Sequence, residues 1–234
     1  MAIAEKRKLM EQIDAMSEAN PMLGLRGCRL GIVYPILPEM QVRAIATATA
    51  KLKKEGLDPK PEIMIPLVST VAELEKLRAV AKKIIAEVAA EEGVEFDIEV
   101  GTMIELPRAA VTADEIATQA DFFSFGTNDL TQTTFGFSRD DVEAEFVPQY
   151  LQEHLLPYNP FATIDPGVAK LVEMGVKLGH EGNPDLVCGV CGEHGGDPDS
   201  IHTFNKIGLD YVSCSPYRVP VARLAAAQAA LEEE

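Results

Sequence analysis

The sequence predicts an α/β protein built around a parallel sheet. Short apolar segments alternate along the chain with longer segments whose apolar residues recur at spacings of three and four. That alternation is typical of parallel strands joined by crossover helices. The strand candidates at 63–68 and 186–191 are almost continuously apolar, as expected for a sheet covered on both faces. The alternation is compatible with two architectures, a doubly wound open sheet and a (β/α)₈ barrel. The glycine-rich phosphate-binding signatures of nucleotide-binding open sheets are absent, which weakens the first.

The first part of the chain is expected to be helical. Residues 3–19 have helical character, so 1–19 is predicted to form an N-terminal helix. Asn20-Pro21 ends it, because a residue before proline avoids the helical region. The apolar run near 27–34 is the weakest strand candidate. A second helix opens at Pro38 and closes at Gly56.

A strand at 63–68 is followed by a long amphipathic helix that starts at Val71. Thr70 is predicted to cap this helix, with Glu73 as the partner in a capping box. Gly93 ends it.

The alternation then repeats towards the C-terminus. Residues 138–163 interrupt it as a long irregular, acidic segment that carries prolines. At most six strand–helix units can be counted, so an eight-unit barrel would lack about two. The remaining predicted elements are strands at 96–104, 121–126, 185–191 and 211–215, and helices at 112–119, 165–179, 199–207 and 218 to the end.

Composition and charge restrict the class of protein. The chain has 234 residues, 47% hydrophobic and 25% charged, which is ordinary globular usage and fits one domain over 1–234. A net charge of −16 argues against nucleic acid and anionic membranes as partners. No apolar run approaches the ~18 residues of a membrane span, and the charged N-terminus does not resemble a secretory signal. Four irregularly spaced cysteines indicate reduced thiols, so a cytoplasmic location is expected.

Polar residues follow two neighbouring strand candidates. Glu105 comes after the strand that ends at 104, and the turn Gly126-Thr127-Asn128-Asp129 follows 121–126. Because chemistry gathers at the carboxyl ends of parallel strands, these groups are expected to converge on one rim. Carboxylate and amide oxygens suit Mg²⁺ or Mn²⁺. The alternative interpretations are a solvated loop for Glu105 and a helix cap for Asn128-Asp129.

The cysteines and one histidine need separate interpretation. Cys188 and Cys191 match C-x-x-C, but they lie within one strand candidate, where an offset of three sends the two sulfurs to opposite faces. A redox or zinc role for the pair is therefore not favoured. Cys191 is expected to act alone at the strand end, and Cys188, Cys28 and Cys214 are expected to be buried in the core. His194, in a glycine-rich loop, is expected either to touch substrate or to hold structure.

Four motifs in order carry a resemblance to one family. They are NPMLGLRGCR (20–29), GTMIELPRA (101–109), FFSFGTNDLTQ (122–132) and CGEHGGDP (191–198). From about residue 19 to 231 the chain resembles the C-terminal phosphoenolpyruvate (PEP)/pyruvate domain of the pyruvate, phosphate dikinases, and more distantly PEP synthase and enzyme I of the sugar phosphotransferase system. The segment 212–220 also fits this family.

The resemblance implies a (β/α)₈ barrel, here an incomplete one of about six units without its first two strands. It also implies the cofactor Mg²⁺ and a set of site residues. In that set Glu105 and Asp129 hold the metal, Gly126, Thr127 and Asn128 line the substrate pocket, Arg26 and Arg139 lie near the phosphate, and Cys191 exchanges the proton at C3 of pyruvate.

The function implied is transfer of a phosphoryl group between a phosphohistidine on another domain of a longer enzyme and the enolate of pyruvate. A chain without that domain is expected to lack full dikinase turnover. A homo-oligomer is expected, since open sheet edges need partners. The alternative is a non-catalytic barrel fragment or interaction module that oligomerises through those edges. A third interpretation, an unrelated PEP or pyruvate lyase on the same barrel, fits the order of the motifs less well.

Overall fold

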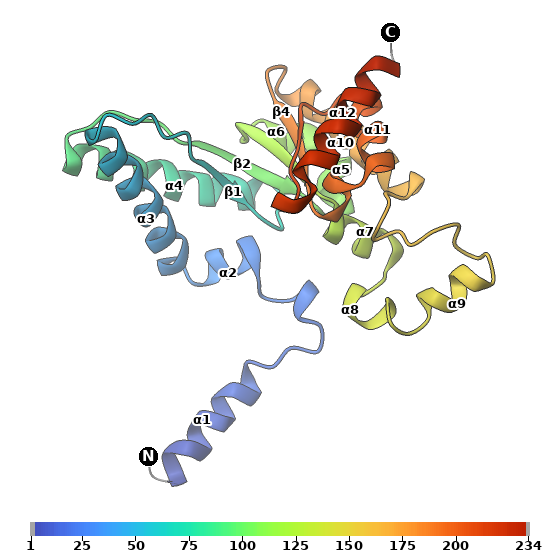
Figure 1. The fold of residues 1–234 in the computed structure, drawn as a ribbon. Coiled ribbons are helices and arrows are strands. Elements are labelled where there is room, and N and C mark those ends of the chain that lie inside the picture. Colours follow the sequence, from blue (N-terminus) through green and yellow to red (C-terminus); the bar gives the residue numbers. More distant parts are fainter. Residues whose placement is uncertain (1–2, 233–234) are drawn as a thin grey trace.

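A fully parallel five-stranded sheet forms the centre of the molecule (Figure 1). The computed structural model describes residues 3–232; the tips of the predicted N- and C-terminal helices, 1–2 and 233–234, lie outside the described residues. The strand order is β1-β2-β3-β4-β5, so each strand pairs with its successor in the chain, and the α/β prediction is confirmed. The strands are β1 (Glu62–Ile65), β2 (Glu99–Ile104), β3 (Phe122–Gly126), β4 (Val187–Cys191) and β5 (Tyr211–Val212).

Helices connect the strands, as crossover topology requires. Helix α1 projects away from the rest of the chain and has no buried residue (Figure 1). The α-helices of the described chain are α1 (Ile3–Ala15), α2 (Gly27–Val33), α3 (Ile36–Lys54), α4 (Val71–Glu92), α5 (Pro107–Val111), α6 (Ala113–Ala117), α7 (Thr127–Phe135), α8 (Arg139–Val142), α9 (Val147–Gln152), α10 (Pro166–Gly182), α11 (Pro198–Ile207) and α12 (Val219–Glu232). The short 3₁₀ turns are η1 (Pro21–Leu23), η2 (Glu193–Gly196) and η3 (Pro216–Arg218).

The two faces of the sheet have different chemistry. Side chains alternate along a strand, so Phe123 and Phe125 of β3 point to one face and Ser124 and Gly126 to the other. The register pairs Phe123 with Cys188 and Gly126 with Cys191. The first face therefore joins the apolar core, and the second carries small and polar groups towards the ends of the strands.

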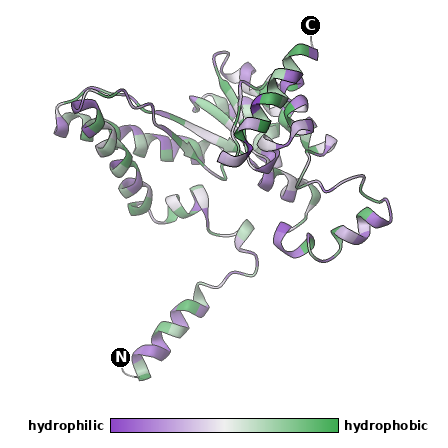
Figure 2. Ribbon diagram, in the orientation of Figure 1, coloured by the Kyte–Doolittle hydropathy of each residue, from purple (hydrophilic) through white to green (hydrophobic). Residues whose placement is uncertain are grey.

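The core lies between the sheet and helices α4, α6 and α10. Leu74 and Ile84 of α4, and Val168 and Val172 of α10, are buried in one cluster with Phe125 of β3. Apolar residues are concentrated in the strands and on the helix faces turned towards them (Figure 2). This packing fixes the strands whose ends carry the polar residues.

The predicted strand near 27–34 is wrong, because this segment forms helix α2. Gly27 has φ +57°, a left-handed conformation that turns the chain immediately after Arg26. Cys28 N–H donates to the Pro66 carbonyl at 3.0 Å, and no strand pairing follows. The described sheet therefore has five strands and not six.

Other differences concern boundaries. Helix α1 ends at Ala15, and α3 begins at Ile36. The helix predicted at 112–119 is present as the shorter α6, and the helix α5 that precedes it was not predicted. The segment 138–163 contains two short helices, α8 and α9. The capping box of α4 is present as predicted, and Gly93 ends that helix with φ +63°. None of the described helices combines the length and apolar character that a membrane crossing requires.

Candidate functional site

The carboxyl ends of β2, β3 and β4 meet around a small cavity of about 100 Å³. Five of the residues predicted for the site line it, and Met103 and Gly192 complete the wall. The five are Glu105, Gly126, Asn128, Asp129 and Cys191. The arrangement follows from parallel pairing, which brings the ends of adjacent strands to the same edge.

Glu105 directly follows β2 and is only 3% exposed. Its Oε1 accepts a hydrogen bond from Leu67 N–H at 2.6 Å. Leu67 has φ +58°, and this turn after β1 directs its N–H at the carboxylate. Burial, followed by the nearby charge of Asp129, raises the pKa of Glu105 to about 7, although the Leu67 N–H opposes the rise.

Asp129 lies in the first turn of α7, where a carboxylate is favoured by the helix dipole. Its Oδ2 is 2.6 Å from Nη2 of Arg26, and its Oδ1 accepts from Nε2 of Gln132 at 3.2 Å. Arg26 is partly buried, and within the described chain its Nε has no hydrogen-bond partner. A cation thus already balances one of the two carboxylates, and a buried donor beside it is left unused.

Gly126 is the last residue of β3 and leaves room for Glu105. A Cβ at this position would lie 2.6 Å from Oε2 of Glu105 and 2.8 Å from Cε of Met103. Contacts that short force the carboxylate to move. The absence of a side chain at Gly126 is therefore part of the geometry of the site.

Two turns, one after β3 and one after β4, are bound to each other. Asn128 Oδ1 accepts from Glu193 N–H at 3.1 Å, and Thr127 Oγ1 lies 3.2 Å from the carbonyl oxygen of Cys191. Gly192, between Cys191 and Glu193 in the chain, has φ +110°. It packs closely against Thr127, since a Cβ at this position would lie 2.9 Å from Thr127 Oγ1. Thr127 itself is fully buried and faces this contact, while the open cavity lies beside Asn128.

The two cysteines of the C-x-x-C motif separate as predicted. Cys191 lines the cavity, whereas Cys188 belongs to the apolar core, where burial raises its pKa to about 12. Burial also raises the pKa of the Cys191 thiol; the neighbouring hydroxyl of Ser124 opposes the rise, and the charges of Glu105 and Asp129 add to it. Cys191 is therefore a protonated thiol that faces the two carboxylates.

The two remaining cysteines differ from each other. Cys28 is buried as predicted and donates from Sγ to the Leu67 carbonyl at 3.1 Å. Cys214 is only half-buried, which corrects the expectation of a core position. All four thiols are free.

Arg139 does not line the cavity in this structure. It begins α8, pairs through Nε with Glu143 at 3.0 Å, and lies 5.7 Å above the ring of Phe161. Its backbone N–H donates to Gln132 Oε1 at 2.8 Å, and Gln132 in turn contacts Asp129. Arg139 is thus connected to the site through one side chain and does not point into it.

Four residues close to the site were not singled out from the sequence. Leu67 and Gln132 contact the two carboxylates, and Met103 and Gly192 line the cavity. Gly192 stands in the quoted CGEHGGDP motif, so a glycine beside Cys191 was a usable signal. Leu67 acts through its backbone, and no side-chain pattern could have shown it.

The residues present fit a hard divalent cation. Glu105 and Asp129 are two oxygen-bearing side chains close enough to interact electrostatically, at the wall of one cavity. The described residues contain no cluster of three or more His, Cys, Asp or Glu side chains that could hold a metal. Mg²⁺ is commonly bound by one or two carboxylates with substrate oxygens and waters in the other positions, so two are sufficient.

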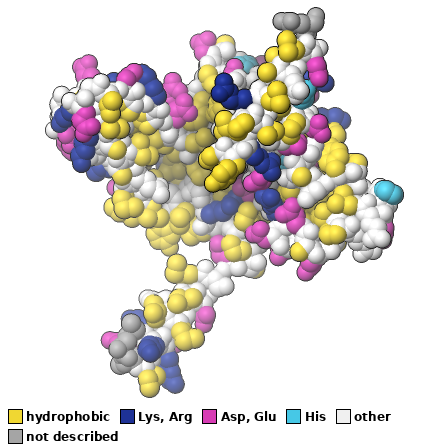
Figure 3. Space-filling model, in the orientation of Figure 1, with side chains coloured by type: hydrophobic (Ala, Val, Ile, Leu, Met, Phe, Trp, Pro, Cys, Tyr) yellow, Lys and Arg dark blue, Asp and Glu magenta, His cyan; other side chains and the backbone are white. Residues whose placement is uncertain are grey.

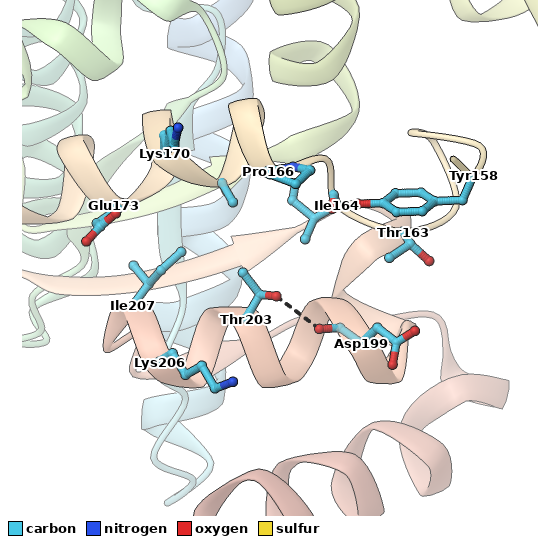
Figure 4. Close-up of a pocket in the computed structure, with 11 residues that line it drawn as sticks. Tyr158, Thr163, Ile164, Pro166, Lys170, Glu173, Asp199, Thr203, Lys206 and Ile207 are labelled. Carbon is cyan, nitrogen blue, oxygen red and sulfur yellow. Dashed lines mark hydrogen bonds between the residues drawn. The ribbon is translucent and has the colours of Figure 1, made fainter. Parts of the chain in front are cut away.

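A larger hollow, of about 450 Å³, lies between α10 and α11 (Figure 4). Ile164 and Ile207 line it, together with the charged side chains of Lys170, Glu173 and Lys206 (Figure 4). These charged side chains do not converge on one point. The smaller cavity at the strand ends is therefore the better candidate, because acid–base and metal-binding groups face each other there.

Comparison with known proteins identifies the family. Residues 1–231 match the family described as "PEP-utilising enzyme, PEP-binding domain". The chain belongs to this family. This PEP-binding domain is similar to several curated proteins over nearly the whole length of the chain. It is 55% identical over 222 residues to the chloroplastic pyruvate, phosphate dikinase of Flaveria pringlei, and 53% identical over 225 residues to pyruvate, phosphate dikinase of Clostridium symbiosum.

The matches cover unequal parts of the two proteins. They include 94% and 95% of this chain but 23% and 26% of the relatives, so the chain spans about a quarter of their length. A citrate lyase structure from Burkholderia xenovorans has a TM-score of 0.53 at 17% identity, covering 80% of this chain and 53% of that one. This likeness concerns the fold alone.

Proposed function

We propose that this PEP-binding domain is the catalytic part of a pyruvate, phosphate dikinase that binds PEP and pyruvate. In the proposed reaction a phosphoryl group passes between a phosphohistidine on another domain and the enolate of pyruvate. The observation that carries the proposal is that Cys191, Glu105 and Asp129 line one cavity at the ends of adjacent parallel strands. The identity to curated dikinases supports the choice of substrate.

The proposed chemistry begins with a proton at C3 of pyruvate. Cys191 in its thiolate form removes this proton, the C–H electron pair forms the C2–C3 double bond, and the carbonyl oxygen becomes an enolate oxygen. In the reverse direction the protonated thiol returns the proton to C3, and the burial of Cys191 favours that form. The cavity wall beside Gly126 and Asn128 would orient the substrate.

Phosphoryl transfer then follows. The enolate oxygen attacks the phosphorus, a phosphorus–oxygen bond forms, and the phosphorus–nitrogen bond breaks with its electron pair returning to the imidazole. Arg26, whose Nε is free for a new partner, would bind the phosphoryl oxygens, and Arg139 would contribute from the edge of the site. Mg²⁺ held by Glu105 and Asp129 would stabilise the negative oxygens of the substrate.

The test is exchange of the C3 protons of pyruvate for deuterium, followed by proton NMR with Mg²⁺ present. Exchange needs the carboxylates, the thiol and bound pyruvate, and it does not need the phosphohistidine. The variant Cys191→Ala is expected to lose exchange by about 10²–10⁴-fold, the usual contribution of a general acid–base group. Cys214→Ala is the matched control, since this half-buried thiol lies outside the cavity wall, and it should keep the wild-type rate.

An unchanged rate in Cys191→Ala would remove Cys191 from the mechanism. A wild-type chain that binds Mg²⁺ and pyruvate without any exchange would instead favour the non-catalytic interaction module.

The proposal extends to architecture and setting. The five parallel strands would be an arc of a (β/α)₈ barrel, and 1–234 a single domain; the family match over residues 1–231 supports this. Four free thiols support a cytoplasmic location. The exposed apolar face around α2 and α3 supports a homo-oligomer.

A further inference from the structure

His194 is a fully buried histidine next to the candidate site that the proposed chemistry does not use. It lies in the 3₁₀ turn η2, three residues after Cys191. Its two ring nitrogens have different partners. Nδ1 is 2.8 Å from Thr127 Oγ1, and Nε2 is 2.8 Å from the carbonyl oxygen of Pro160. The sequence left open whether His194 touches substrate, and both nitrogens are in fact occupied by protein groups.

The partners determine which nitrogen carries the proton. A carbonyl oxygen only accepts, so Nε2 must be the protonated nitrogen that donates to Pro160. Burial lowers the pKa of His194, although the Pro160 carbonyl opposes the change, so the ring is neutral at neutral pH. Nδ1 of a neutral ring with Nε2 protonated has only a lone pair, and it accepts the proton of the Thr127 hydroxyl.

This arrangement restricts Thr127 and the two turns beside it. The single hydroxyl proton points towards His194, so Thr127 cannot donate at the same time to the carbonyl oxygen of Cys191, 3.2 Å away. The His194–Thr127 hydrogen bond itself links the two turns, because His194 follows β4 and Thr127 follows β3. Thr127 is adjacent to Asn128, which holds the Glu193 N–H at 3.1 Å. The distance between the cavity residues that follow β3 and those that follow β4 is thus set by a chain of contacts with His194 at its centre.

Pro160, whose carbonyl accepts from His194, is the last residue in this series of contacts. It belongs to the irregular segment 138–163. The neighbouring Phe161 lies under the guanidinium of Arg139. The segment is therefore joined to the site at two points: through Arg139 and Gln132 to Asp129, and through Pro160 and His194 to Thr127.

We propose that His194 is a positioning residue, which holds the Thr127 hydroxyl and thereby sets the place of Cys191 relative to Asn128 and Asp129, with the Pro160 carbonyl selecting the tautomer that can do so. The proposal rests on the function proposed above for its activity readout. Its geometric content can be tested without that function.

The first test compares pyruvate C3 exchange in His194→Leu, Thr127→Val and the double variant. Each single variant is expected to lower kcat for exchange about tenfold with KM unchanged, because a small misplacement of an acid–base group affects the reacting geometry and not the binding of the carboxylate end. The double variant should lose no more than the worse single variant, since both remove one contact. Thr127→Ser keeps the hydroxyl and should restore most of kcat. His180→Gln, on α10, is the control histidine and should behave as wild type.

The second readout is independent of activity. The ¹⁵N shifts of His194 should show protonated Nε2 and unprotonated Nδ1, and alkylation of Cys191 by iodoacetamide, followed by peptide mass spectrometry, should change in rate in Thr127→Val while Cys214 does not. Thr127→Val removes one hydroxyl only, so it keeps the proposal testable if His194→Leu does not fold.

Each outcome decides a different question. Wild-type kcat in folded His194→Leu and Thr127→Val, fully additive losses, or the opposite tautomer would overturn the positioning role. Absence of exchange in the wild type would overturn the proposed function, and the tautomer and the Cys191 alkylation rates would then decide the positioning role alone.

Discussion

At the scale of single residues, Asp121 joins three separate elements. It precedes β3, accepts a hydrogen bond from Val100 N–H of β2 at 2.8 Å, and pairs with Arg78 of α4. Lys82 Nζ is 3.5 Å away. Burial opposes ionisation of Asp121, but the Val100 N–H and the Arg78 guanidinium outweigh it, so the pKa of this carboxyl is lowered.

The lowered pKa of Asp121 implies a pH-dependent contribution to stability. A depressed carboxyl pKa stabilises the folded state above the unfolded pKa of about 3.9, and the contribution is lost as pH falls through the lower folded value. Asp121→Asn is expected to reduce the free energy of unfolding at pH 7 by about 1–3 kcal/mol. Urea titrations at pH 7 and near pH 3 measure this, and the difference from wild type should shrink at the lower pH. Asp185→Asn, at an exposed position, is the control; a difference that grows at low pH would contradict the argument.

Residue types at strand ends were predictable, and their partners were not. Glu105, Asp129 and Cys191 could be brought together from sequence because parallel pairing puts strand ends at one edge. The pairing of Arg26 with Asp129 joins residues 103 positions apart and depends on the turn at Gly27. The same limit applies to Arg139, whose contacts with Glu143 and Phe161 depend on how the segment 138–163 folds back.

At the scale of elements, helix α4 shows local sequence and tertiary packing in agreement. Thr70 Oγ1 accepts from Glu73 N–H at 3.4 Å, and Glu73 Oε2 accepts from Thr70 N–H at 2.9 Å. Glu73 also accepts from the N–H and hydroxyl of Ser69. The same helix buries Leu74 and Leu77 immediately afterwards, so the cap fixes the point at which the apolar stripe meets the sheet.

Removing the cap of α4 should therefore have a measurable cost. Thr70→Ala is expected to destabilise the protein by about 1 kcal/mol, because the first N–H groups of the helix lose a partner. For a chain of this size that corresponds to a fall in Tm of about 2–4 °C by differential scanning calorimetry. Thr70→Ser keeps the hydroxyl and should stay close to wild type. Equal losses in the two variants would assign the effect to the methyl group and not to the cap.

The elements that sequence reasoning placed well have long periodic patterns or explicit caps, as α4 does. The segment 27–34 shows the opposite case. Its apolar run is too short for periodicity to separate a strand from a buried helix, and the outcome depends on the left-handed turn at Gly27. Similarly, β5 contains only Tyr211 and Val212, because just two residue pairs match the register of β4.

At the scale of the whole molecule, the apolar surface around α2 and α3 is unusually open. A groove of about 630 Å³ lies between these helices and β1, with a predominantly apolar lining. Exposed hydrophobic side chains stand near it, and yellow patches gather over this part of the molecule in Figure 3. They include Val33, Tyr34, Ile36 and Met40. In the described sheet β1 is also an edge strand, so its unpaired backbone lies beside this surface.

The sequence predicted a need for partners but not the place where they bind. Counting strand–helix units predicted an incomplete barrel of about six units, and the described sheet has five strands. The position of the exposed apolar face depends on how α2 and α3 pack on α4. This packing leaves Ile36 and Met40 outside the core, with 68% and 60% of their surface exposed. Helical periodicity in α3 cannot show this, because Met40 lies only two residues from the buried Val42.

We expect the chain to self-associate through this face. Large contiguous apolar patches are uncommon on monomers, and burying Ile36 and Met40 against a second copy would remove them from water. Light scattering on a sizing column should give a mass that is a multiple of 25.4 kDa, with and without Mg²⁺ and pyruvate. The double substitution Ile36→Glu and Met40→Glu should return the chain to 25.4 kDa, whereas Val111→Glu on α5, also exposed, should not. A wild-type monomer at every concentration, or a double variant that still assembles, would place the association elsewhere or remove it, and the C3 exchange assay on that monomer would then report on a site formed by one chain alone.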